Sequence, residues 1–81
     1  MSAHKFIAVG CNAWGEGATQ KAAIASARRN IPWGLLKGPA QVTVYKAPPS
    51  ARVDGHGDIR YAECDAAPVE IETVTLKRST R

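Results

Sequence analysis

The chain has 81 residues, of which 44% are hydrophobic, and a formal net charge of +4. This length allows one domain, residues 1–81, near the lower size limit for folding without a metal or disulfide framework, and the hydrophobic share argues against disorder. There is no apolar run of about eighteen residues and no leader-like N-terminal segment, so we expect a cytoplasmic protein that is neither secreted nor membrane-spanning.

The first predicted element is a strand over residues 4–11, where the apolar run from Phe6 to Val9 is typical of a strand covered on both faces. Residues 10–17 contain three glycines, and we expect a loop there because glycine permits backbone conformations that other residues resist.

Residues 17–30 form the only convincing helix of the sequence. Thr19 is the expected N-cap, and Arg28 and Arg29 in the last turn complement the helix dipole. Asn30 is the expected left-handed cap, and Pro32 forbids continuation. The predicted buried stripe is narrow and built mostly of methyl groups, so the helix can approach a sheet closely; it consists of Ala23, Ile24, Ala27 and Ile31.

Residues 31–40 contain two prolines and two glycines, which exclude regular structure across most of the segment. Trp33, Leu35 and Leu36 nevertheless need a core or a partner. We expect them to fold back as a lid over the end of the core; the alternative is an exposed apolar anchor at a contact surface.

Three further strands are predicted. Residues 41–47 alternate in hydrophobicity, as a strand with one wetted face does. Residues 52–64 are expected to form either one strand interrupted by a turn or a short approach followed by a strand at 58–64, with turn residues at 54–58. In the last strand, at 69–77, the apolar residues change phase, which predicts a β-bulge near Glu72 and Thr73.

The predicted fold is therefore an α+β two-layer sandwich, with one helix on a mainly antiparallel four-stranded sheet in the order β-α-β-β-β. The last three strands are expected to form a meander. The residues expected to supply much of the core are Phe6, Val9, Ile24, Ala27, Val42, Val44, Ile71 and Leu76.

No stretch has the signature of a catalytic or cofactor site. Gly10 and Gly15 have the glycine spacing of a phosphate-binding loop, but Glu16 stands where the lysine is needed and Gly17 where a hydroxyl is needed. The dinucleotide fingerprint fails because Gln20 replaces its third glycine. We expect no catalytic residue, no cofactor and no small-molecule substrate.

Two groups of residues are of types that can bind metal ions. Asp54, His56 and Asp58 alternate in a glycine-rich turn, and a solvated hairpin tip is favoured there over a metal site. Cys11 and Cys64 lack metal-site spacing, so two reduced thiols are expected, with a single disulfide left open. We expect no bound metal.

Charge is segregated along the chain. Residues 1–53 carry seven basic side chains and one acid, residues 54–72 six acids and one base, and residues 73–81 three bases. This distribution predicts a dipolar surface and is unlike that of a uniformly basic nucleic-acid binder. Residues 77–81 are a candidate disordered basic tail.

Direct nucleic-acid binding stays open as the alternative function. Lys21, Arg28 and Arg29 can share one side of the helix and act on phosphates together with the basic tail. Aromatic side chains that could stack on unpaired bases are Trp14, Trp33 and Tyr45.

In size, strand–helix–strands order, segregated charge and absence of active-site chemistry, the chain resembles the small single-domain inhibitors encoded by phages, including anti-CRISPR proteins. The resemblance implies a non-enzymatic protein that occupies a surface of a larger host protein or nucleoprotein complex, and it supplies no site residue. From the residues themselves, we expect Arg28, Arg29 and Trp33 in the contact face. Trp14 and the strand face of Glu70 and Glu72 are the second choices.

Overall fold

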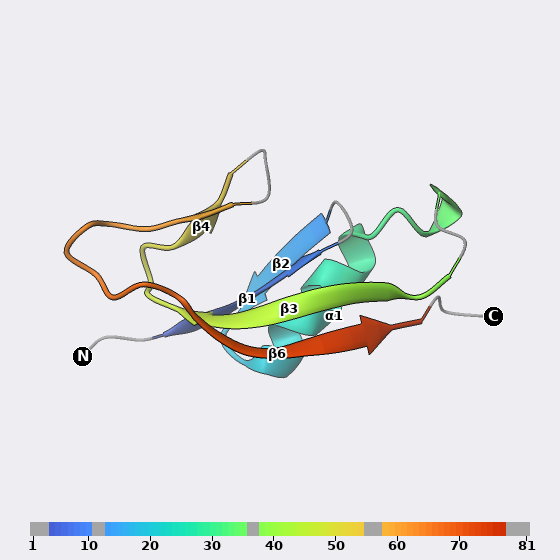
Figure 1. Ribbon diagram of the computed structural model, residues 1–81, viewed down its shortest axis with the longest axis horizontal. Helices are drawn as coiled ribbons and strands as arrows, with labels where there is room; N and C mark the ends of the chain where they lie inside the picture. Colours follow the sequence, from blue (N-terminus) through green and yellow to red (C-terminus); the bar gives the residue numbers. More distant parts are fainter. Residues whose placement is uncertain (1–3, 11–12, 36–37, 55–57, 78–81) are drawn as a thin grey trace.

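The computed structural model describes residues 4–10, 13–35, 38–54 and 58–77. Figure 1 shows the elements along the chain. They are β1 (Lys5–Gly10), β2 (Ala13–Gly17), α1 (Gln20–Asn30), the 3-10 helix η1 (Trp33–Leu35), β3 (Ala40–Ala47), β4 (Arg52–Val53), β5 (Ile59–Arg60) and β6 (Val69–Leu76).

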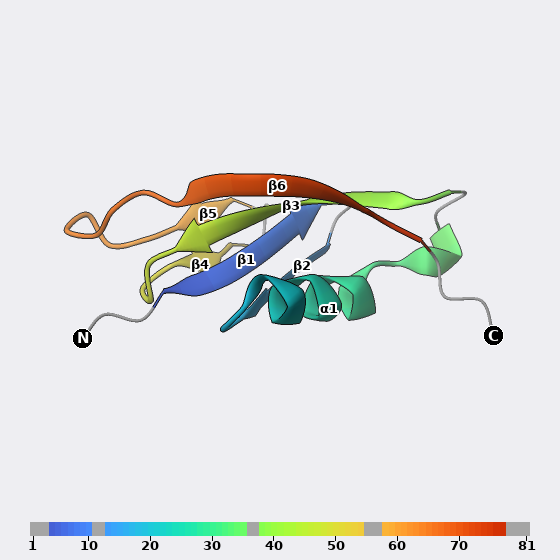
Figure 2. The ribbon, with the colours of Figure 1, turned by 90° about the horizontal axis from the view of Figure 1, so that it is seen from below.

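The main sheet has four antiparallel strands in the order β2-β1-β3-β6, and α1 packs against one of its faces. Figure 2 shows α1 lying along one side of the sheet. Strands β4 and β5 form a separate two-stranded hairpin. The predicted fold class, one helix on a four-stranded antiparallel sheet, is confirmed.

The predicted order of elements is wrong in two places. The segment expected to be a glycine-rich loop contains β2, which forms a hairpin with β1, so the helix follows two strands. Only Ile59–Arg60 of the strand expected at 58–64 is extended and paired, and it pairs outside the main sheet. The last three predicted strands therefore form no meander, because β5 pairs with β4 in the separate hairpin and β6 pairs directly with β3.

Strand β2 tolerates glycine because the helix lies directly on it. A Cβ atom on Gly15 would overlap the backbone nitrogen of Ala27, and one on Gly17 would come within 2.6 Å of the Ala22 Cβ. Glycine is normally depleted in strands since it offers no side chain to pack. Here the missing side chains make room for the backbone of α1.

The helix begins as predicted and ends differently. The Thr19 hydroxyl accepts a hydrogen bond from the Ala22 amide at 3.1 Å and caps the first turn. Asn30 is the last helical residue, and the C-cap Ile31 has extended backbone angles, so the expected left-handed cap at Asn30 is not formed. Pro32 follows where the helix has stopped.

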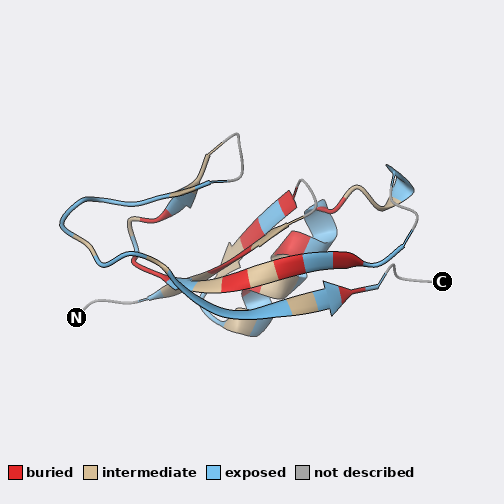
Figure 3. Cartoon of the chain, in the orientation of Figure 1, coloured by how far each residue is buried: buried red, intermediate tan, exposed pale blue. Residues whose placement is uncertain are grey.

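The larger core lies between α1 and the sheet. It consists mostly of small and β-branched side chains. Figure 3 shows that buried residues alternate with more exposed ones along β3, as expected for a strand with one covered face. Its buried members are Ala8, Ala13, Ala23, Ala27, Ile31, Ala40, Val42, Val44 and Leu76.

Six of the eight predicted core residues belong to this cluster. Phe6 and Ile24 are partly buried and pack against it; the buried members among the eight are Ala27, Val42, Val44 and Leu76. Val9 packs instead in a second cluster on the opposite face of the sheet. Ile71 is 39% exposed, so its assignment to the core is wrong.

The second cluster explains what the β4–β5 hairpin does. Ile7, Ala47 and Ala51 are buried there, with Val53 and Ile59 of the hairpin packed against them. The hairpin thus covers part of the sheet face that α1 leaves open.

The predicted bulge in the last strand is present close to its expected place. Val44 pairs with Glu72 and the next residue, Tyr45, pairs with Glu70, so Ile71 is the extra residue of β6. A bulge changes the phase of a strand: Val74 and Leu76 face the larger core after it, whereas before it Glu70 pairs with Tyr45 on the opposite face.

The approach of α1 to β2 predicts a sharp difference between two glycines. Gly15→Ala should lower the free energy of unfolding by about 2–3 kcal/mol, because backbone atoms of α1 occupy the space of the new methyl group. The matched control is Gly34→Ala, where nothing lies within 4 Å; we expect no loss, or a gain of up to about 1 kcal/mol. Urea unfolding measures both, and equal effects of the two substitutions would contradict the packing.

Candidate binding surface at the basic end of the sheet

The last turn of α1 is joined to the end of β6. The guanidinium of Arg28 donates a hydrogen bond from Nη2 to the carbonyl oxygen of Lys77 at 3.0 Å, across 49 residues of sequence. Arg29 and Lys77 are exposed beside it. We call these three residues, Arg28, Arg29 and Lys77, the basic end.

The side chain of Trp33 holds the segment that follows α1 at the basic end. Its indole nitrogen donates to the Arg28 carbonyl oxygen at 3.0 Å, and its ring packs on the larger core while staying half-buried. Of the three residues predicted to form a lid, Trp33 packs on the core, Leu35 does not, and Leu36 lies outside the described residues. Within η1 the side chain of Leu35 is 83% exposed, so an apolar group lies in the element next to the basic end.

The acids of the described chain lie away from the basic end. Glu72 is the nearest acid along β6, five residues before Lys77 and about 16 Å away at the rise of a strand. Glu16 pairs with Lys5 at 3.0 Å, where β1 begins and β2 ends. The segregation of charge in the sequence is therefore kept at the basic end, whereas elsewhere the fold brings acids and bases together, as in the ion pairs Lys5–Glu16 and Arg60–Asp54.

Asp54 organises the β4–β5 turn. Its carboxylate accepts hydrogen bonds from the Asp58 amide at 3.0 Å and from Arg60 Nε at 2.9 Å. This hydrogen bond and the negative charge of Asp54 raise the pKa of Arg60. The hairpin-tip interpretation fits these contacts; His56 lies outside the described residues.

Trp14 and the two glutamates lie elsewhere. Trp14 is 38% exposed and is paired with Val9, whose side chain belongs to the sheet face opposite α1. Its carbonyl oxygen accepts a hydrogen bond from the Asn30 side chain at 2.8 Å. Glu70 and Glu72 are exposed in the first half of β6, but they share no strand face: the bulge between them pairs Glu72 with Val44 on the α1 side and Glu70 with Tyr45 on the other. The structure thus brings together Arg28, Arg29 and Trp33 of the predicted contact residues.

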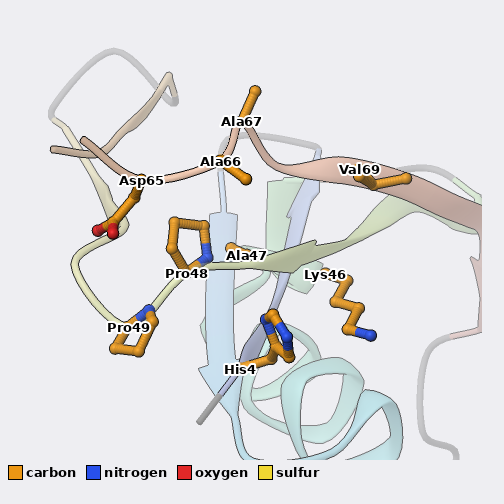
Figure 4. Close-up of a pocket in the computed structure, with 9 residues that line it drawn as sticks. All are labelled: His4, Lys46, Ala47, Pro48, Pro49, Asp65, Ala66, Ala67 and Val69. Carbon is orange, nitrogen blue, oxygen red and sulfur yellow. The ribbon is translucent and has the colours of Figure 1, made fainter. Parts of the chain in front are cut away.

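One hollow, of about 350 Å³, lies beside the start of β1 and the end of β3 (Figure 4). Its polar side chains do not converge: the Asp65 carboxylate and the Lys46 ammonium point apart on opposite sides of it. Asp65 also accepts a hydrogen bond from the Ser50 hydroxyl at 2.5 Å. The rest of the lining is small or apolar, apart from His4.

A second hollow, of about 400 Å³, lies over the sheet face opposite α1. It is lined by two tyrosines, Tyr45 and Tyr61, with Asp58, Thr43 and apolar side chains around them. Within the described residues no three His, Cys, Asp or Glu side chains lie close enough to hold a metal ion. Cys64 is an exposed free thiol, while Cys11 and the candidate tail residues 78–81 lie outside the described part.

Comparison of the chain with protein-family models, with curated proteins and with solved structures finds no match in any of the three. None of the helices in the described ranges is both long and apolar enough to cross a membrane.

The two neighbouring arginines should differ in their contribution to stability. Arg28→Ala removes the hydrogen bond to the Lys77 carbonyl and should lower the free energy of unfolding by about 0.5–1.5 kcal/mol. Arg29→Ala, at an exposed position with the same charge, should change it by less than about 0.5 kcal/mol. Denaturant titration of both variants tests this, and an equal loss in both would mean that the tie between α1 and β6 contributes nothing.

Proposed function

We propose that this chain is a small non-enzymatic inhibitor or adaptor that docks on a larger host protein or nucleoprotein complex, such as a CRISPR effector, and blocks a site there. The observation that carries the proposal is the basic end. Arg28, Arg29 and Lys77 present three positive charges from two elements that a hydrogen bond holds together, without an acid of the described chain beside them.

The held geometry favours docking on a structured partner. The Arg28 side chain is held by its hydrogen bond to the Lys77 carbonyl oxygen, and the Trp33 side chain is held by its hydrogen bond to the Arg28 carbonyl oxygen. Less side-chain freedom is then lost on binding, and preorganisation of this kind raises affinity. The neighbouring exposed Leu35 adds an apolar contact, and arginine beside apolar side chains is typical of the energetically important centre of an interface.

The charge distribution favours a partner that displays both signs. The basic end would face phosphates or acidic side chains, while Glu70 and Glu72 in the other half of β6 would face bases. Complementary patches of this kind steer encounter and fix orientation. A nucleoprotein complex presents phosphates and basic protein surface close together.

A charge reversal at the basic end tests the proposal. Tagged wild-type chain should retain a stoichiometric complex from an extract of its native host, and Arg29→Glu should lower that retention at least about tenfold. The matched control is Arg52→Glu, the same charge change at an exposed position on β4 in the separate hairpin, which should retain the complex. Equal loss in both variants, or no stoichiometric partner, would contradict the proposal.

The alternative is direct nucleic-acid binding by the same arginines, which is favoured because no acid of the described residues lies beside them. A mobility-shift series with single- and double-stranded DNA over a range of salt separates the two functions. Phosphate binding predicts tight association that weakens steeply with salt, with a slope reduced by about one in Arg29→Glu. The inhibitor proposal predicts weak binding of naked DNA at physiological salt.

A further inference from the structure

The two edges of the main sheet differ in how they are protected. The β2 edge has five residues and lies against α1, and the Asn30 side chain occupies the Trp14 carbonyl. The β6 edge has eight residues, pairs with β3 on one side, and meets no strand of the described chain on the other. An unpaired edge of this length is a template for another strand.

The side chains of β6 are unusually open for a strand of a small domain. Six of its eight residues are exposed, including Val69 at 62% and Ile71 at 39%. Figure 3 shows the exposure running along most of the strand. The segment is also rich in β-branched side chains, which favour extended pairing.

The charges of β6 change sign along its length. Glu70 and Glu72 lie in its first half, uncharged residues fill 73–76, and Lys77 follows directly. Charged residues of one sign along an edge discourage pairing between copies. Because the sign of the charge changes along β6, parallel pairing of two copies would bring like charges together. Antiparallel pairing would instead bring the acidic half of each β6 strand close to Lys77 of the other copy.

From these observations, we propose that two copies of this chain associate by antiparallel pairing of their β6 edges into one continuous eight-stranded sheet. The two-fold axis passes near Val74, perpendicular to the sheet, so residues that oppose each other across it lie on the same face. Alternation from Leu76 places Lys77 on the face opposite α1, and the bulge places Glu70 on that face, where it is paired with Tyr45. Glu70 of each copy therefore lies close to Lys77 of the other, and this acid–base contact occurs twice. The bulge at Ile71 bends the first part of β6, which places the regular part of the ladder over residues 72–76. The inference is independent of the proposed function, since it needs no third molecule.

Charge swapping tests the proposal on the isolated chain. Sedimentation equilibrium over about 10 to 500 µM covers the range in which a small interface dissociates. We expect a monomer–dimer equilibrium for the wild type and a dissociation constant raised about tenfold by either Glu70→Lys or Lys77→Glu, because two contacts per dimer become repulsive. The double variant E70K/K77E should return to within about threefold of the wild type.

The control is Glu63→Lys, the same charge change at an exposed position outside the strands, which should leave the constant unchanged. A monomer at every concentration would overturn the proposal. So would a dimer that is indifferent to the single reversals, or one whose single-variant losses are not recovered in the double variant, since association would then use another surface. Circular dichroism of each variant distinguishes lost folding from lost association.

Amide exchange supplies a second readout. In a β6–β6 dimer, the amides of residues 72–76 that point away from β3 should become protected as protein concentration rises, while the amides of β2 should not change. Protection independent of concentration would contradict the pairing. A partner strand from a different protein would leave the purified chain monomeric, so that outcome also counts against a second copy as the occupant.

Discussion

The close contact between the backbone of α1 and strand β2 is the constraint on which the rest of the structure depends. Gly15 and Gly17 leave no side chain between the two elements, and Ala23 and Ala27 present only methyl groups to the core. A small chain gains little from long side chains in a thin core, and close approach lets it bury backbone and methyl surface instead. The helix axis is then held near the sheet over the whole length of α1.

This contact also positions the candidate binding surface. Because α1 packs directly on the backbone of β2 at Gly15 and Gly17, its last turn lies at the end of the sheet where β3 begins and β6 finishes. There the hydrogen bond from Arg28 to the Lys77 carbonyl joins helix and sheet, and Trp33 closes the end of the core. The packing of α1 on β2 thus helps to bring Arg28, Arg29 and Lys77 of the basic end together.

Local patterns in the sequence predicted what depends on local physics. The Thr19 cap, the alternation in β3 and the phase change in β6 each reflect neighbouring residues, and each is present in the structure. Strand β2 was predicted as a loop because glycine is a poor strand former, although small residues at 13, 15 and 17 alternate with Trp14 and Glu16. That alternation in size was the available signal for a strand under a closely packed helix.

The remaining features depend on contacts that no local pattern encodes. Arg28 and Arg29 could be selected from the helix end, but their meeting with Lys77 follows from the strand order, which places β6 beside β3. Trp14 and Trp33 looked alike in the sequence, yet one lies half-exposed at the edge and the other packs on the core. The hairpin at 52–60 could not be separated from the main sheet because turn residues permit either arrangement.

The most direct test of the central contact is a nuclear Overhauser measurement on isotopically labelled protein in solution. Close packing of α1 on β2 predicts strong cross-peaks from the Gly15 α-protons to the amide and methyl protons of Ala27, together with peaks between Gly17 and Ala22. Absence of these cross-peaks, in spectra that still show α1 as helical and β2 as extended, would contradict the close packing of helix on strand.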